Sequence, residues 1–322
     1  MNRLTHALTA VALSIAAQHI CAQAYPAKPI RVVVPFAAAG PADIQSRWLA
    51  ARLTTDLGKQ VLIDNRGGAG GIVGTQAVTG SPADGYTLLF ASVGALTVAP
   101  YVVEKMPYNP KQDLTPVVRV VTAPCVLVTG PKARYGTLAE LVSYAKANPG
   151  KLTYASAGSG TTTHLGPELL KREAHIDMLH VPYRGAAPAI TDVLAGSADV
   201  ILADAPVVLP YLTSNRLKAI AIATSARSPA LPNVPTIAEA GYKNVLVSTW
   251  YGLVAPARTP REIVVKLNGA VNKVLSGADA KSFYGDQGVQ INGGTPEEFG
   301  SFIAAETARW STLAKAVGVK MD

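Results

Sequence analysis

The sequence predicts an α/β fold of two lobes joined by two crossings, and three observations point to it. Segments typical of strands alternate with segments typical of helices, as in parallel sheets with crossover helices. The chain has 322 residues, enough for two domains of about 150 residues each. Two apolar runs, residues 117–128 and 250–255, suit connections between domains. We therefore expect one lobe from residues 25–123 with 250–322, and the other from residues 124–249.

Composition and charge narrow the class of protein. The chain is 49% hydrophobic and 16% charged, which is typical of a globular protein. Its formal charge of +8 is scattered along the sequence, without a lysine or arginine block or a basic stripe interleaved with aromatic residues. Nucleic acid is therefore not an expected partner. A mild positive field favours the approach of small anions.

The first 24 residues have the pattern of a secretory signal peptide. Arg3 precedes an apolar stretch, residues 7–17, that is too short to span a bilayer. Ala22-Gln23-Ala24 fits the cleavage rule, so we expect cleavage after Ala24 and a periplasmic mature protein. The residues around Cys21 do not match a lipoprotein signal. Cleavage leaves Cys125 as the only cysteine, and we expect a buried thiol without a disulfide.

The first mature unit predicts an anion site. Residues 30–34 (IRVVV) read as a buried strand, residues 36–41 form a small-residue loop, and Asp43 opens an amphipathic helix. Ligands bind at such strand-to-helix junctions in open α/β sheets. Free backbone N–H groups and the helix dipole both favour an anion there. The simplest role of Asp43 is that of N-cap of its helix.

The remaining elements follow from apolar periodicity and turn residues. Residues 92–95 are expected to form a loop, residues 107–116 are irregular, and Pro124 interrupts the first crossing. The predicted strands are 60–64, 86–91, 152–155, 178–181, 200–203 and 218–223. The predicted helices are 72–78, 138–147, 164–173, 187–194, 207–213, 260–276 and 296–316.

A second strand-to-helix loop, residues 156–163 (SAGSGTTT), is rich in hydroxyls and flexible amides. Such a loop can wrap an anion with N–H and O–H groups, or it can be an ordinary connection that ends in a threonine N-cap. His164 follows in the first turn of the next helix, where it faces the cleft or caps. Asp204 follows a strand, as a helix N-cap or as an acceptor in the cleft.

Nucleotide binding, hydrolysis and metal binding find little support in the sequence. The glycines at residues 68–74 follow a strand, but the next strand ends without the acidic residue that holds a ribose. No G-x-S-x-G elbow occurs, and the histidines lack the close spacing of a metal helix. We therefore expect no cofactor, no metal and no enzymatic activity. Trp250, Tyr251 and Trp310 are expected to pack in the core and hinge.

Seven sequence blocks in order give the mature chain a family resemblance. They are YPAKPIRVVVPFAAAGPAD (25–43), VLIDNRGGAGGIVG (61–74), PADGYTLLF (82–90), YASAGSGTTTHL (154–165), HVPYRGAAPAITDVLAG (180–196), LPNVPTIAEAGY (231–242) and WYGLVAPARTP (250–260). The chain resembles the substrate-binding proteins of tripartite tricarboxylate transporters, the Bug (TctC-like) family. The resemblance runs essentially end to end.

This resemblance implies a type II periplasmic-binding-protein fold, a two-lobed "Venus flytrap" that closes on a small carboxylate. It also implies that the first-lobe loop grips one carboxylate, with Asp43 in support. One departure stands out, because this chain has Ala39-Gly40 where the family usually has two glycines. The extra Cβ restricts the backbone there. The implied ligand-binding residues are Phe36, Ala38, Ala39, Gly40, Asp43, Ser92, Ser156, Gly158, Ser159, Thr161, Thr162, Thr163, His164 and Asp204.

The leading hypothesis is a monomeric binding protein that captures a dicarboxylate or an aromatic carboxylate such as terephthalate. It would deliver this ligand to the membrane permease subunits of its transporter. Alternatives are a sensor subunit that presents its ligand to a signalling receptor, and a secreted enzyme that acts on small acids. A ligand-sensing part of a transcription regulator would need a DNA-binding segment before Tyr25, where the signal peptide lies.

Overall fold

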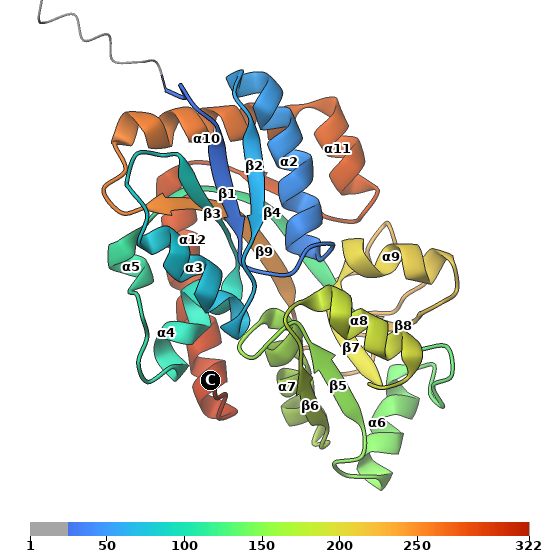
Figure 1. Cartoon of the computed structure of the whole chain (residues 1–322). Coiled ribbons are helices and arrows are strands. Elements are labelled where there is room, and N and C mark those ends of the chain that lie inside the picture. The colour runs from blue at the N-terminus through green and yellow to red at the C-terminus, as the bar shows by residue number, and fades with distance from the viewer. Residues whose placement is uncertain (1–24, 322) are drawn as a thin grey trace, which may run out of the picture.

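A computed structural model describes residues 25–321 (Figure 1). The predicted signal peptide, and Cys21 within it, lie outside the described residues. The strands are β1 (Ile30–Val34), β2 (Val61–Asn65), β3 (Thr87–Ala91), β4 (Leu114–Thr129), β5 (Thr153–Ser156), β6 (Leu179–Pro182), β7 (Val200–Asp204), β8 (Lys218–Ile222), β9 (Ser248–Pro256) and β10 (Gln290–Gly293).

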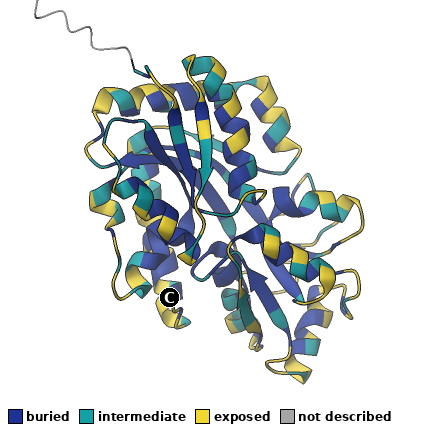
Figure 2. Ribbon diagram, in the orientation of Figure 1, coloured by how far each residue is buried: buried dark blue, intermediate teal, exposed yellow. Residues whose placement is uncertain are grey.

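Helices cover the strands on the outside. They are α2 (Pro41–Leu57), α3 (Ile72–Thr79), α4 (Ala99–Val102), α5 (Pro110–Asp113), α6 (Leu138–Ala147), α7 (Thr162–Ala174), α8 (Ala186–Ala195), α9 (Ala205–Thr213), α10 (Arg261–Ser276), α11 (Ala278–Gly285) and α12 (Pro296–Ala316), with a 3₁₀ turn η1 (Ala69–Gly71) and a π-helical turn η2 (Gly94–Val98). Their outward faces are exposed and the strands beneath them are buried (Figure 2).

The strands run in the order β2-β1-β3-β9-β4-β7-β5-β6, and β8 and β10 also pair with β4. Pairing is parallel within β2-β1-β3 and within β7-β5-β6, whereas β9 and β4 in the middle pair antiparallel with their neighbours. The two parallel groups carry α2, α3 and α10–α12 in one half, and α6–α9 in the other (Figure 1). The alternation seen in the sequence therefore becomes two α/β halves around a shared centre.

Strand β4 passes through both halves. Its first part, up to Pro124, pairs with β9, and its last part, from Cys125, pairs with β7 and β8. The expectation that Pro124 interrupts the strand is wrong, because β4 is continuous from Leu114 to Thr129. Proline is tolerated at this position since the neighbouring strand changes there. The return run, predicted at residues 250–255, is β9.

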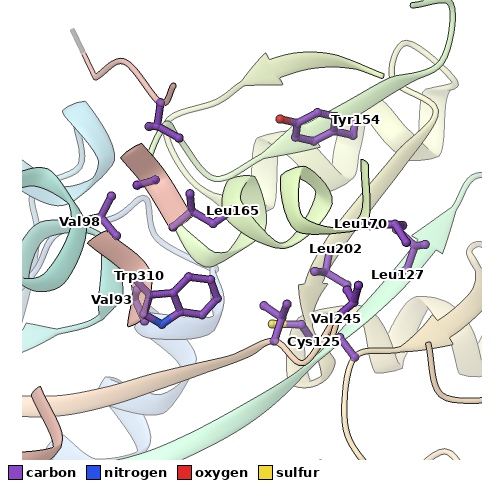
Figure 3. Packing of buried hydrophobic residues seen from close by; sticks show 14 of the residues in the cluster. Val93, Val98, Cys125, Leu127, Tyr154, Leu165, Leu170, Leu202, Val245 and Trp310 are labelled. Atoms are coloured by element: carbon purple, nitrogen blue, oxygen red, sulfur yellow. The ribbon is translucent and has the colours of Figure 1, made fainter. Parts of the chain in front are cut away.

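The largest apolar cluster extends from one half into the other. Figure 3 shows Val93, which follows β3, and Trp310 of α12 near Leu165 of α7 and Leu202 of β7, all of them buried. Cys125 lies in this cluster and is fully buried, as predicted. Trp250 and Trp310 are also buried, which confirms their predicted place in the core.

Several helix boundaries in the structure differ from those predicted from the sequence. The helix expected to open at Asp43 begins two residues earlier, at Pro41, because the fixed φ of proline suits the first helical position. The helix expected from His164 begins at Thr162. Residues 92–95, expected to form a loop, lead into η2. Helix α11 and strand β10 are too short for their periodicity to predict them. The helix predicted over residues 296–316 is confirmed as α12.

No helix within residues 25–321 combines the length and apolarity needed to cross a membrane.

Candidate ligand-binding site

A small cavity lies where the two halves meet. Its volume is about 30 Å³, which leaves room for only a few water molecules. Its walls come from the loops after β1, β3 and β5, the start of α8, the end of β7, and β9. The lining residues are Phe36, Gly40, Pro41, Ala42, Ser92, Val93, Gly94, Ala157, Thr161, Thr162, Thr163, Ala186, Asp204, Thr249 and Tyr251. These loops follow the carboxyl ends of parallel strands, where ligands bind in α/β folds.

Four helices begin at this cavity. Gly40 is the N-cap of α2, Thr161 of α7 and Asp204 of α9, and Ala186 is the first residue of α8. The first N–H groups of a helix have no partner within the helix, and the dipole makes that end positive. No lysine, arginine or histidine is among the lining residues. These helix ends therefore offer neutral donors to an anion, whereas the Asp204 carboxylate in the same wall opposes one while it is ionised.

The loop after β1 is held by Asp43, which is not the N-cap that the sequence suggested. The N-cap is Gly40, and the Asp43 carboxylate reaches back to accept the Ala39 N–H at 2.9 Å. It also pairs with Arg47 at 2.9 Å. Burial opposes the charge on Asp43, but these hydrogen bonds outweigh it and hold its pKa below the usual range. Asp43 thus fixes the turn in which Ala39 takes a φ of 60°.

The threonines of the second loop bond mainly to the loop itself. Thr161 donates to the Gly158 carbonyl at 2.6 Å, and the Thr163 hydroxyl accepts the Ala157 N–H at 2.7 Å. The hydroxyl of Thr162 lies 2.6 Å from that of Thr249 on β9. All three threonines line the cavity. Thr161 holds the N-cap position of α7 without a side-chain capping bond, and the loop forms a wall of the cavity, so its binding of an anion stays a prediction.

Asp204 is 1% exposed and forms the floor of the cavity with two residues from β9. Its carboxylate accepts hydrogen bonds from Thr249 at 2.7 Å and from Tyr251 at 2.5 Å, and the Cys125 thiol lies 3.5 Å away. Burial raises the pKa of Asp204 to about 6 although these bonds oppose the rise. Asp204 holds the N-cap position of α9 without a side-chain capping bond, so its carboxylate acts as an acceptor at the cavity.

Thr249 lines the cavity although the sequence did not indicate it, and Tyr251, predicted only to pack, lines it as well. Both project from β9 toward the cavity, two residues apart, while Trp250 between them is buried in the core. Alternating hydroxyl and apolar residues in a strand point to opposite faces. Hydroxyls at every second position of a buried strand were the available signal.

Other predicted site residues lie elsewhere. Gly158 and Ser159 line a neighbouring hollow of about 220 Å³, which also has Gly68–Gly71, Arg184 and Met321 in its wall. Ala38 and Ala39 are exposed and do not line the cavity. His164 neither lines it nor caps α7. Its Nδ1 accepts the Gly160 N–H at 3.0 Å from behind the loop, and Ser156 bonds to His180 there. The predicted lining residues that the structure brings together are Phe36, Gly40, Ser92, Thr161, Thr162, Thr163 and Asp204.

The two halves touch through glycines beside the cavity. A Cβ added to Gly70 would lie 2.4 Å from the Ser159 carbonyl oxygen, and one added to Gly94 would lie 3.4 Å from that of Gly160. Met321 packs against Gly70 and Gly160 together. At Gly70, the absence of a Cβ is therefore what lets these loops meet.

Comparisons with known proteins identify the family of this chain. Residues 45–319 match the model of the tripartite tricarboxylate transporter family receptor, TctC.

The chain belongs to this receptor family.

Among curated relatives, the chain is similar to the protein BugT of Bordetella pertussis, with 37% identity over 99% of both chains. Three solved structures are also similar. The periplasmic binding protein BugD has 33% identity and a TM-score of 0.88, over 92% of this chain and 100% of that one. R. palustris Rpa4515 with adipate has 33% identity and a TM-score of 0.89, over 92% and 99%. MatC of Rhodopseudomonas palustris with bound malate has 32% identity and a TM-score of 0.86, over 90% and 99%.

These comparisons confirm the predicted family and fold class. The chain has the two-lobed periplasmic-binding-protein fold, and it is a periplasmic solute-binding protein of the TctC/Bug family. Residues 25–321 contain no group of three or more histidine, cysteine, aspartate or glutamate residues that could hold a metal ion.

Proposed function

We propose that this receptor captures a small carboxylate between its lobes and delivers it to a tripartite tricarboxylate-type membrane transporter. The ligand is a dicarboxylate or an aromatic carboxylate such as terephthalate. The observation that carries the proposal is the convergence of four helix N-termini on one cavity without a cationic side chain in its wall. Two relatives of this fold were solved with adipate and with malate, both dicarboxylates.

Neutral donors suit reversible capture. Each N–H or O–H bond to a carboxylate is favourable, but it lacks the strength of a bidentate arginine pair. The lobe-1 donors are the first amides of α2 and the hydroxyl of Ser92, and the lobe-2 donors are the first amides of α7. A carboxylate held from both sides stabilises the lobes against each other, so ligand binding favours the closed arrangement.

Entry of such a ligand requires the lobes to part. The cavity of about 30 Å³ is far smaller than the roughly 300 Å³ at the lower end of ligand pockets. Rotation at β4 and β9 opens it, because these strands are the connections between the parallel groups. We place lobe 1 at residues 25–123 with 250–322 and lobe 2 at residues 124–249, supported by the change of β4 partners at Pro124 and Cys125.

The same proposal covers the remaining properties of the protein. Residues 1–24 are a signal peptide cleaved after Ala24, and the mature protein works as a monomer in the periplasm with the permease subunits as partners. It is not an enzyme. Burial raises the pKa of the Cys125 thiol well above its usual value, so this group is a poor nucleophile.

A thermal-shift screen of dicarboxylates and aromatic acids tests the proposal. A ligand at 100 times its Kd adds about 2.7 kcal/mol to the unfolding free energy. We expect at least one acid to raise the melting temperature and its methyl ester to have no effect. Equal shifts from acid and ester would contradict carboxylate recognition. Thr162→Val or Gly40→Val should then weaken binding of that acid while the protein remains folded, and unchanged affinity in both would place the site elsewhere.

A further inference from the structure

A stacked pair of histidines lies behind the second loop. The imidazole rings of His164 (α7) and His180 (β6) are 3.8 Å apart between centroids and only 5° from parallel. The Tyr154 ring of β5 lies beside the pair, with its centroid 4.9 Å from that of His180 and 6.2 Å from that of His164. His164 is 6% exposed and His180 is half-buried. His164 is therefore largely shielded from water, whereas His180 is shielded only in part.

Each ring is connected to a backbone amide of the loop tip. The Nδ1 atom of His164 accepts the Gly160 N–H at 3.0 Å. The Nε2 atom of His180 lies 2.6 Å from the Ser156 hydroxyl, whose oxygen accepts the Gly158 N–H at 3.2 Å. A backbone N–H can only donate, so Nδ1 of His164 must be without a proton and the ring must be neutral.

The loop tip that these bonds hold is the part that meets lobe 1. A Cβ added to Gly158 would lie 3.5 Å from the Gly70 Cα, and the Gly160 carbonyl faces Gly94. Thr161, directly after the tip, lines the cavity. The shape of residues 158–160 therefore decides both the cavity wall and the contact between the lobes.

We propose that His164 and His180 are positioning residues for ligand capture, which keep the tip at residues 158–160 in its closing shape only while His164 is neutral. This inference rests on the proposed function. Protonation of Nδ1 would set two N–H groups against each other and release the Gly160 amide. The histidines act through the loop and need no contact with the ligand.

The surroundings keep the pair neutral. Burial, and then the nearby Lys171 ammonium, lower the pKa of His164 to about 4. Burial and the His164 ring lower the pKa of His180 to about 3. The charged groups that face the pair come from α7, where Glu168 accepts from the Tyr154 hydroxyl at 2.5 Å and pairs with Lys171 at 2.8 Å. Asp177 lies behind Lys171 at 3.8 Å. The tip therefore keeps its shape down to strongly acid pH.

Four variants of the full mature chain separate the roles of the two rings. His164→Asn can place an amide oxygen near Nδ1, so it keeps the acceptor and removes the titration. His164→Phe keeps the ring stack but leaves the Gly160 N–H without an acceptor. His180→Phe also keeps the stack, and it removes the ring nitrogen that bonds to the Ser156 hydroxyl. His175→Asn is the matched control, because His175 is exposed and asparagine tolerates its φ of 52°.

The first measurement needs no ligand. Amide resonances of Gly158 and Gly160 are followed by NMR from pH 7.5 to 3.5. In the wild type and in His175→Asn, we expect the Gly160 resonance to move with a midpoint near pH 4, and in His164→Asn we expect no such titration. A Gly160 midpoint near 6.5, or the same titration in His164→Asn, would overturn the proposal.

The second measurement uses adipate and malate as probes by calorimetry at pH 7.5. His164→Phe and His180→Phe should each weaken binding about tenfold, the effect of a buried polar group left without its partner. His164→Asn should stay within about threefold of the wild type. Equal losses in His164→Asn and His164→Phe would contradict the acceptor role. If neither probe binds the wild type, the dicarboxylate form of the proposed function fails, while the amide titration still decides on the histidines.

Discussion

The Tyr251 hydroxyl donates a 2.5 Å hydrogen bond to the carboxylate of Asp204 and so joins β9 to the end of β7 at the floor of the cavity. One partner belongs to a strand that connects the lobes and the other to lobe 2 alone. Thr249 makes a second such bond from the same face of β9. A buried negative charge therefore lies where we propose that an anion binds, and this arrangement leads to the first prediction.

Asp204 should couple carboxylate binding to proton uptake. Burial raises its pKa from 3.8 to about 6, so the folded protein holds this proton more tightly than the unfolded chain. The contribution of Asp204 to stability is therefore most favourable at low pH, and it is lost as pH rises from about 4 through 6. At pH 7 the ionised group also repels an arriving carboxylate, and binding should raise its pKa further.

Calorimetry with adipate or malate in buffers of different ionisation enthalpy, at pH 6.5 to 7.5, measures this uptake. In Asp204→Asn we expect the uptake to vanish and the affinity at pH 7.5 to rise roughly tenfold, the equivalent of one pKa unit. Asp286→Asn, at an exposed position of lobe 1, serves as the control. Binding without proton uptake in the wild type would refute the coupling.

Gly70→Ala should hinder lobe closure. The new Cβ would lie 2.4 Å from the Ser159 carbonyl oxygen and would take a φ of 60°. Gly58→Ala is a matched control, because Gly58 has a φ of 64° and nothing within 4 Å of the added Cβ. Each variant should lose about 1 kcal/mol of stability from the left-handed backbone. Only Gly70→Ala should also weaken carboxylate binding tenfold or more and enlarge the liganded protein in X-ray scattering. The same affinity in both variants would argue against the glycine contact.

Ala39→Gly should stabilise the protein without changing its ligand affinity. Ala39 has a φ of 60°, a conformation that glycine adopts without the steric cost of a Cβ. Its side chain is exposed and does not line the cavity. We expect the unfolding free energy to rise by about 1 kcal/mol and the melting temperature to rise by about 2 °C. A changed ligand preference would show instead that this departure from the usual two glycines tunes recognition.

Arg184 should speed the capture of anions. It is exposed and lines the hollow of about 220 Å³ beside the cavity. Charges at the approach to a site act mainly on the association rate, and salt screens them. In Arg184→Gln we expect the association rate of a carboxylate ligand, measured by stopped flow, to fall about threefold at low ionic strength. At 0.5 M salt the rate should match that of the wild type, because the Debye length is then only a few ångströms. Arg134→Gln, in the loop after β4, should show no such difference.

Local patterns predicted the elements better than the cavity. The β-branched run at residues 30–34 and the long apolar run of β4 are strands because their side chains favour a pleated, buried surface, and this holds whatever packs on them. The roles of His164 and Thr249 depend on what lies across from each. The sequence places His164 in the first turn of a helix, but the direction of its side chain depends on the hydrogen bond with the Gly160 amide. Thr249 gains its role from Asp204, 45 residues earlier. Contacts such as Gly70 with Ser159 arise only when both lobes are folded.

The antiparallel pairing of β4 with β9 limits how the lobes can move. Residues Leu114–Pro124 of β4 pair with Ser248–Pro256 of β9, with two shifts of register along the pairing, so two neighbouring strands lead out of lobe 1 together. A single tether would let one lobe swivel freely about its length. A hydrogen-bonded ribbon resists that twist and resists sliding, but it flexes across its thin direction. The lobes should therefore open along one bending path, and every ligand that enters must use the same mouth.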